Sequence, residues 1–125
     1  MKKIISTPNA PSAIGPYSQG VDIGNMVYLS GQIPTIVETG EFPEGISAQT
    51  KQSLTNVKNL LAEAGLSMSN IVKTTVFLSD MENFTGMNEV YTTFFEENSY
   101  PARSTVEVAR LPKDALVEIE VIAIR

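Results

Sequence analysis

The chain is organised around one stretch near its C-terminus, Pro101-Ala102-Arg103-Ser104-Thr105-Val106-Glu107-Val108-Ala109-Arg110-Leu111-Pro112. Its β-branched residues predict a short strand that begins directly after a proline. Because side chains alternate along a strand, Arg103 and Thr105 share one face and Val106 lies on the other. A guanidinium matches a carboxylate or phosphate through two parallel hydrogen bonds. Arg103 is therefore a candidate for binding a small acidic ligand, and a structural salt bridge is the alternative.

The last predicted strand, over residues 116–124, gives a reason to expect an oligomer. Its odd-numbered residues from 117 to 123 are all apolar, which suits a face packed against helices. The opposite face carries Glu118 and Glu120, but also Ile122 and Ile124. A sheet face that is open to water is normally polar throughout. We therefore expect a second subunit to cover this half-apolar face, with its carboxylates inside the interface.

The remaining patterns predict a mixed α and β chain. Alternating or β-branched runs predict a strand at 2–6, a hairpin at 21–30 that turns at Gly24-Asn25, and a strand at 71–78. Apolar spacing of three and four residues predicts helices over 46–64, closed by Gly65, and over 83–95, with Asn83 as N-cap. No linker or repeat interrupts the 125 residues. We expect one α+β domain over residues 1–125, with two helices on one face of a mixed sheet.

Composition excludes several kinds of site. The chain has neither cysteine nor histidine, and its formal net charge is −5. It therefore lacks a thiolate nucleophile, a Ser-His-Asp triad and the commonest zinc ligand. The acidic charge disfavours nucleic acid as a partner. No apolar run is long enough for a membrane span or a signal peptide, which indicates a cytoplasmic protein without a membrane partner.

Several motifs, in order along the chain, carry a resemblance to a known family. They are Asn9-Ala10-Pro11 with Ile14-Gly15-Pro16-Tyr17-Ser18-Gln19-Gly20, then Ser30-Gly31-Gln32-Ile33-Pro34, Gln52-Ser53-Leu54-Thr55-Asn56-Val57, Val72-Lys73-Thr74-Thr75-Val76-Phe77, and the run from Pro101 to Val121. With these motifs the chain resembles the Rid family, the YjgF-type reactive-intermediate (enamine/imine) deaminases. The resemblance implies a chorismate-mutase-like fold and a homotrimer with its sites at subunit interfaces.

The resemblance also implies roles for the two charged residues. Arg103 takes the position of the family's clamp for the substrate carboxylate. Glu118 takes that of a glutamate that holds or activates the hydrolytic water, as a general base or an orienting acceptor. Alternation along the strand places Glu120 on the same face as Glu118, so alternation alone does not distinguish the two glutamates. An interface salt bridge is the alternative role for Glu118.

Five further residues match positions near the family's substrate. Tyr17 looks like a tyrosine that lines the cleft, although it could also anchor its loop to the core. Ser30 and Gly31 end a predicted strand, where Gly31 permits close approach of a ligand or forms a bulge. Asn88 matches an asparagine near the cleft, or it simply faces solvent from its helix. Thr105 stands where many members carry cysteine, so we expect it to contribute backbone groups and bulk.

The expected function follows from this resemblance. Family members hydrolyse 2-imino acids and their enamine tautomers, which arise from pyridoxal-phosphate-dependent dehydratases, to 2-keto acids and ammonia. That chemistry needs no cofactor or metal, and it points to a 2-iminobutanoate/2-iminopropanoate deaminase. One alternative is a binding module or sensor for a small keto acid. Another is the translation-inhibitor or endoribonuclease role that some members are given, which the acidity and the lack of histidine disfavour.

Overall fold

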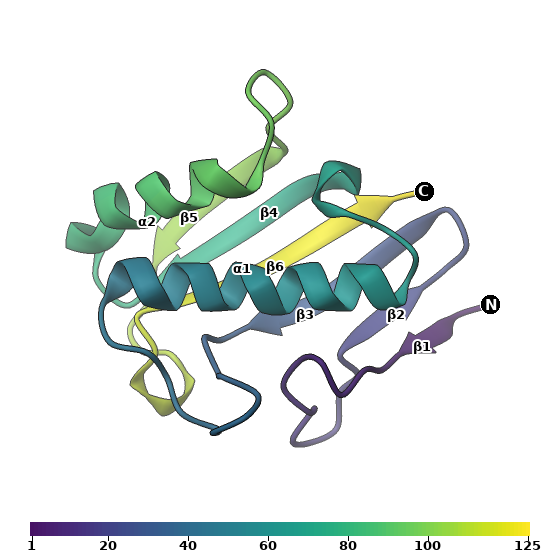
Figure 1. Ribbon diagram of the computed structural model, residues 1–125, viewed down its shortest axis with the longest axis horizontal. Helices are drawn as coiled ribbons and strands as arrows, with labels where there is room; N and C mark the ends of the chain where they lie inside the picture. Colours follow the sequence, from purple (N-terminus) through teal and green to yellow (C-terminus); the bar gives the residue numbers. More distant parts are fainter.

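The computed structural model describes the whole chain, from Met1 to Arg125, and is built on one six-stranded sheet (Figure 1). The strands are β1 (Lys3–Ile5), β2 (Gly20–Asp22), β3 (Met26–Gln32), β4 (Ile71–Leu78), β5 (Ala102–Glu107) and β6 (Val117–Ile124). They lie side by side in the order β1-β2-β3-β6-β4-β5. Only β4 and β5 pair in parallel, and the other neighbours are antiparallel. The sheet is therefore mixed, as predicted, and β5 forms one of its edges.

Two helices, α1 (Ile46–Glu63) and α2 (Phe84–Tyr91), lie on the same face of this sheet (Figure 1). Helix α2 connects β4 to β5, because parallel neighbours need a crossover connection. Helix α1 is closed by Gly65, which follows the C-cap residue Ala64 and whose φ of 77° is the left-handed conformation predicted for a C-terminal glycine. The N–H of Leu66 then donates to the carbonyl of Leu61 at 2.8 Å, which closes the last turn. The predicted helical layer is confirmed.

The start of α2 differs from the prediction. Asn83 makes no capping hydrogen bond through its side chain. A short 3-10 turn, Met81–Asn83, precedes the helix, and the Asp80 carboxylate accepts the N–H of Glu82 there at 2.9 Å. Asp80 therefore caps the segment one turn earlier than expected. The regular helix also ends at Tyr91 rather than Phe95, and continues as a 3-10 turn over Thr92–Phe94.

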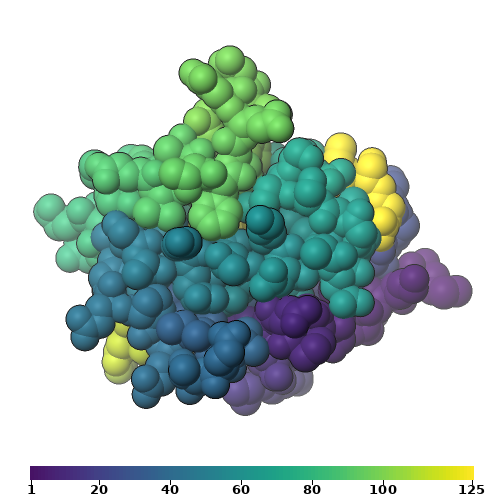
Figure 2. Space-filling model, viewed as in Figure 1, coloured from purple at the N-terminus to yellow at the C-terminus, as the bar shows by residue number.

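The core lies between the helices and the sheet. Side chains of α1 and of the odd-numbered face of β6 are buried there: Leu54, Val57, Leu60, Leu61, Val117, Ile119, Val121 and Ala123. Figure 2, seen from the helix side, shows helix and loop side chains hiding most of the sheet. Neither helix is both long enough and apolar enough to cross a membrane.

The other face of the sheet carries no covering element. Tyr28 on β3, Val106 on β5 and Ile124 on β6 remain 40%, 42% and 42% exposed. The mixture of polar and apolar residues on the even-numbered face of β6 predicted such a half-apolar, uncovered face. A face of this kind is unusual for a sheet in contact with water. The face therefore has the character of an interface surface.

Candidate functional site

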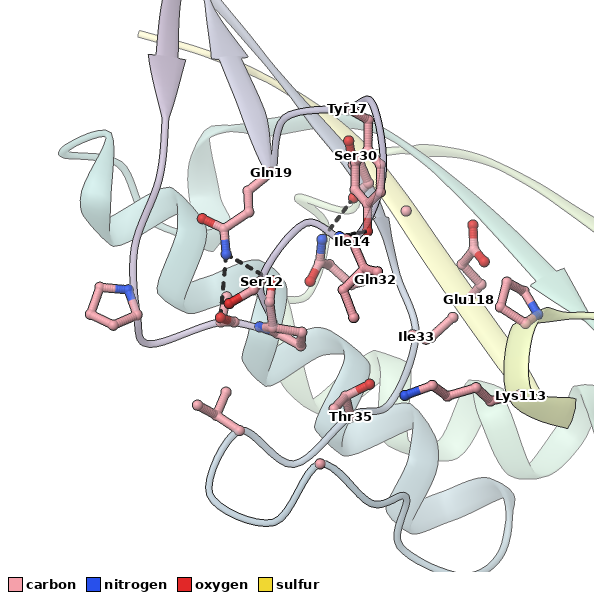
Figure 3. A pocket seen from close by; sticks show the side chains of 17 residues that line it. Ser12, Ile14, Tyr17, Gln19, Ser30, Gln32, Ile33, Thr35, Lys113 and Glu118 are labelled. Carbon is pink, nitrogen blue, oxygen red and sulfur yellow. Dashed lines mark hydrogen bonds between the residues drawn. The ribbon is translucent and has the colours of Figure 1, made fainter.

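Four of the predicted site residues line one pocket of about 760 Å³ (Figure 3). They are Tyr17, Ser30, Gly31 and Glu118. The walls come from the N-terminal loop, from the end of β3 with the loop that follows it, and from the segment that leads into β6. Residues that are far apart in the sequence thus meet at one end of the two central strands β3 and β6.

The N-terminal wall of the pocket is held by Gln19, which sequence reasoning did not single out. Its Oε1 accepts the N–H of Thr7 at 2.7 Å, and its Nε2 donates to the carbonyl of Pro11 at 2.8 Å. Ser30 extends this support, because its hydroxyl donates to the carbonyl of Ser18 at 2.6 Å. These bonds tie a loop without regular structure to the sheet. The only sequence signal for Gln19 was its place inside the motif that ends at Gly20.

Tyr17 lies at the pocket wall rather than in the core. Its side chain is 53% exposed, and its hydroxyl accepts the N–H of Ile14 at 3.4 Å. Because the ring of Tyr17 is exposed, it does not anchor its loop to the core, which was the alternative interpretation. A phenol in this position can offer a hydrogen bond and an aromatic wall to a bound molecule.

Gly31 creates the space that Glu118 occupies. The pairing of β3 with β6 slips between Leu29 and Gln32, so this segment is irregular, as the alternative interpretation of Gly31 expected. A Cβ built on Gly31 would overlap the Glu118 carboxylate and lie 2.9 Å from its Cδ. The close approach that glycine permits is therefore an approach by the carboxylate of Glu118.

Glu118 is half-buried, and its electrostatics suit proton transfer. Burial raises the pKa of the Glu118 carboxyl above its ordinary value, and the negative charge of Glu120 raises it further. Both salt bridges of the chain lie elsewhere, Arg110 with Asp114 and Arg125 with Asp22, so Glu118 has no ion-pair partner. A carboxylate whose pKa moves towards neutrality is better matched to general-base chemistry.

Arg103 projects from β5 onto α2, where three side chains hold it. Its Nη1 donates to Oδ1 of Asn88 at 2.7 Å. Its guanidinium carbon lies 4.7 Å from the ring centre of Tyr91 and 5.6 Å from that of Phe84. No carboxylate lies within 4.0 Å of Arg103, so no salt bridge within the chain accounts for it. Several N–H donors of the guanidinium are left for an anion.

The side chains that contact Arg103 are themselves held in place. Tyr91 is buried, and its hydroxyl hydrogen-bonds to the hydroxyl of Thr74 at 2.7 Å. Burial raises the pKa of this phenol, so it remains neutral. Asn88 is half-buried and faces Arg103 rather than open solvent. Together the ring and the amide set the direction of the guanidinium.

Thr105 shares the helix-facing side of β5 with Arg103. Its hydroxyl oxygen is buried and has no hydrogen-bond partner. The side chain therefore fills space beside Arg103 and does not present a hydroxyl to solvent. Because β5 is an edge strand, some of its backbone N–H and C=O groups are unpaired and can still serve a ligand or another chain.

Arg103 and Glu118 lie on opposite faces of the sheet. Arg103 is paired with Thr74, and Thr74 in turn with Val121 of β6, which points into the core. Glu118 is an odd number of residues from Val121, so alternation turns it to the uncovered face. The structure therefore forms two separate clusters: Arg103 with Asn88 and Thr105, and the pocket that contains Glu118.

Comparison with known proteins gives the family. Residues 7–125 match the family model described as Endoribonuclease L-PSP. The chain is 57% identical over 127 residues to the 2-iminobutanoate/2-iminopropanoate deaminase of Escherichia coli strain K12, covering 100% of this chain and 99% of that protein. The crystal structure of the Escherichia coli YjgF gene product is 57% identical, with a TM-score of 0.95 over 98% of both chains. The chain belongs to the Rid/YjgF family.

This membership confirms the resemblance that the motifs carry. A RutC family protein of Pasteurella multocida is 58% identical over 128 residues, which cover 100% of this chain and 99% of that one. Another solved member of the Rid/YjgF family, Escherichia coli TdcF, contains bound serine. It is 55% identical to this chain, with a TM-score of 0.95 over 98% of each chain.

Proposed function

We propose that the protein is a 2-iminobutanoate/2-iminopropanoate deaminase, which hydrolyses short 2-imino acids to 2-keto acids and ammonia. The observation that carries the proposal is the guanidinium of Arg103, held by Asn88 and Tyr91 without any carboxylate partner. Such a cation is prepared for the carboxylate of a small acid. The 57% identity to a deaminase of that name supports this substrate class.

The reaction follows from the two charged residues. Arg103 binds the substrate carboxylate, which fixes the neighbouring imine carbon. Glu118 accepts a proton from a water molecule as its oxygen adds to that carbon, giving a carbinolamine. The imine reacts in its protonated form, so this carbinolamine is neutral. Glu118 then returns its proton to the nitrogen, which leaves as ammonia, and the carbinolamine hydroxyl gives its proton to the departing ammonia as the keto group forms. Water and imine are consumed one to one, without oxidant, reductant or cofactor. Base catalysis of this kind contributes about 10²- to 10⁴-fold.

The site requires two copies of the chain. Within one chain Arg103 and Glu118 lie on opposite faces of the sheet, so they cannot reach a single short substrate. We place the active site between subunits of a homotrimer, with Arg103, Asn88 and Thr105 from one copy. The neighbouring copy supplies Glu118 and the pocket that contains Tyr17, Ser30 and Gly31. The half-apolar face of the sheet supports this assembly, because a neighbour would cover it.

A mixing experiment tests function and assembly together. The Arg103→Ala and Glu118→Gln proteins are expected to be nearly inactive on 2-iminobutanoate generated by a dehydratase. After they are unfolded and refolded together in equal amounts, random pairing across a head-to-tail interface gives about one intact site in four. Recovery of about a quarter of wild-type turnover supports the proposal. An Arg103→Ala protein as fast as wild type would refute the clamp, and failure of the mixture to recover activity would refute the shared site.

The same assay, applied to the wild-type protein, separates catalysis from simple binding. A keto-acid sensor would bind 2-oxobutanoate saturably through Arg103 and release no ammonia from the imine. Turnover by the wild-type protein excludes that alternative.

A further inference from the structure

The pocket that contains Glu118 also contains a lysine. Lys113 lines the same wall, in the segment that leads into β6. In Figure 3 its amino end points across the pocket toward Thr35, and the Glu118 carboxylate points away from it. No acidic side chain lies within 4.0 Å of the Lys113 amine, because the two salt bridges of the chain involve arginines only. The pocket therefore holds one cation, the Lys113 amine, without an acidic partner within 4.0 Å.

The backbone at Lys113 is strained in a way that directs this side chain. Lys113 has φ 55° and ψ 27°, and Asp114 has φ 57°, so two consecutive non-glycine residues adopt the left-handed conformation. L-residues avoid that region, and a pair of them persists only where the surroundings enforce it. The Asp114 carboxylate accepts a hydrogen bond from Nε of Arg110 at 2.9 Å, and the N–H of Ala115 donates to the carbonyl of Pro112 at 3.1 Å. These contacts hold the turn that carries Lys113.

We propose that Lys113 is a second anion-binding point, so that the pocket also takes 2-imino and 2-keto acids whose side chain ends in a carboxylate. The inference rests on the proposed deaminase function, in which the first carboxylate binds Arg103 and the reacting carbon lies near Glu118. A side chain with a terminal carboxylate then extends along the pocket to the Lys113 amine. The hydroxyl-bearing residues Ser12 and Thr35 line the same pocket and supply further polar contacts.

Two five-carbon keto acids test this inference directly. The probes are 2-oxoglutarate and 2-oxopentanoate, which share chain length and differ in the terminal carboxylate. Calorimetric titration of the wild-type protein is expected to show about three- to fivefold tighter binding of 2-oxoglutarate, the range that one partly exposed ion pair supplies. In the Lys113→Met protein the ratio of the two affinities is expected to fall to one or below. Methionine has a similar unbranched chain and meets the same backbone strain, so folding should be comparable.

Two more variants sharpen the result. Lys58→Met removes a lysine of α1 that lies outside this pocket, in a separate groove, and should leave the affinity ratio at the wild-type value. Lys113→Gly relieves the left-handed strain, so it should raise the midpoint of thermal unfolding and still abolish the preference for 2-oxoglutarate.

Failure of the inference is distinguishable from failure of the proposed function. If 2-oxopentanoate binds but 2-oxoglutarate has no advantage, or if Lys113→Met keeps the advantage, the role of Lys113 is refuted and the deaminase proposal stands. If neither keto acid binds and 2-iminobutanoate is not hydrolysed, the deaminase proposal is refuted, and the inference with it.

Discussion

The contact between Gly31 and Glu118 gives the sharpest prediction. A methyl group added at Gly31 would overlap the Glu118 carboxylate, with its Cβ 2.9 Å from Cδ, whereas ordinary contacts begin at 3.4 Å. Gly31 does not have a left-handed φ, so alanine meets no backbone strain there. The Gly31→Ala substitution must therefore move the carboxylate of Glu118 by at least half an ångström, about the tolerance of a catalytic constellation.

The expected loss falls on turnover more than on stability. The clashing atoms are the end of a flexible side chain, so the free energy of unfolding should drop by only about 1 kcal/mol. Displacing a catalytic group by about 1 Å costs on the order of 100-fold in rate. We expect kcat on 2-iminobutanoate to fall about 100-fold, with 2-oxobutanoate affinity nearly retained, since Arg103 is untouched.

A double-mutant cycle identifies the cause of that loss. If Gly31→Ala acts by displacing the carboxylate, adding it to Glu118→Gln should lower the residual rate by less than about threefold. If the methyl group blocks the substrate itself, the double variant loses rate and keto-acid affinity together. A folded Gly31→Ala protein with wild-type kcat would refute the assignment of Glu118 as the carboxylate that acts on water.

Three further substitutions test the surroundings of the two clusters. Tyr91→Phe leaves the buried Thr74 hydroxyl without its partner and should cost about 1–3 kcal/mol in urea unfolding, yet keep keto-acid affinity because the ring remains beneath Arg103. In the isolated chain the folded pKa of Glu118 is raised above the reference 4.5. At protein concentrations low enough to keep the chain monomeric, wild type should therefore lose stability relative to Glu118→Gln as pH rises through the folded pKa; urea unfolding from about pH 4 to pH 8 measures this, and a gain would contradict it. Thr105→Ala should stay within about tenfold of wild-type turnover, since its buried hydroxyl makes no hydrogen bond; total loss would show that the hydroxyl takes part in the chemistry.

Regular alternation and helical spacing made most of the fold predictable. The odd-numbered residues of β6 are buried and its even-numbered residues lie on the other face, as the pattern required. The hairpin turn at Gly24-Asn25 and the glycine that ends α1 followed from their backbone requirements. The start of α2 was less predictable, because two polar residues, Asp80 and Asn83, could each cap a turn, and only the local geometry chose Asp80.

The candidate site was predictable in its residues but not in its arrangement. Motif resemblance indicated Arg103 and Glu118, and alternation within each strand was correct. Whether the two residues share a face depends on the register between β5, β4 and β6, which no pattern within one strand encodes. Lys113 was not predicted as a site residue for a similar reason. Its side chain is carried by a left-handed turn, and lysine is not among the residues that favour that conformation.

In the proposed trimer, the contact between neighbouring chains that buries the uncovered sheet face also completes the active site. Each chain carries an unpaired guanidinium on one surface and a carboxylate with no ion-pair partner on another, and these charges are complementary. Burial and Glu120 raise the pKa of Glu118 in the isolated chain, whereas an approaching Arg103 from the neighbour favours the ionised form. Assembly therefore brings Glu118 into its basic form where the substrate carboxylate is bound. A chain kept monomeric would retain its fold and its pocket, but its Glu118 would be harder to ionise and would have no clamped acid within reach.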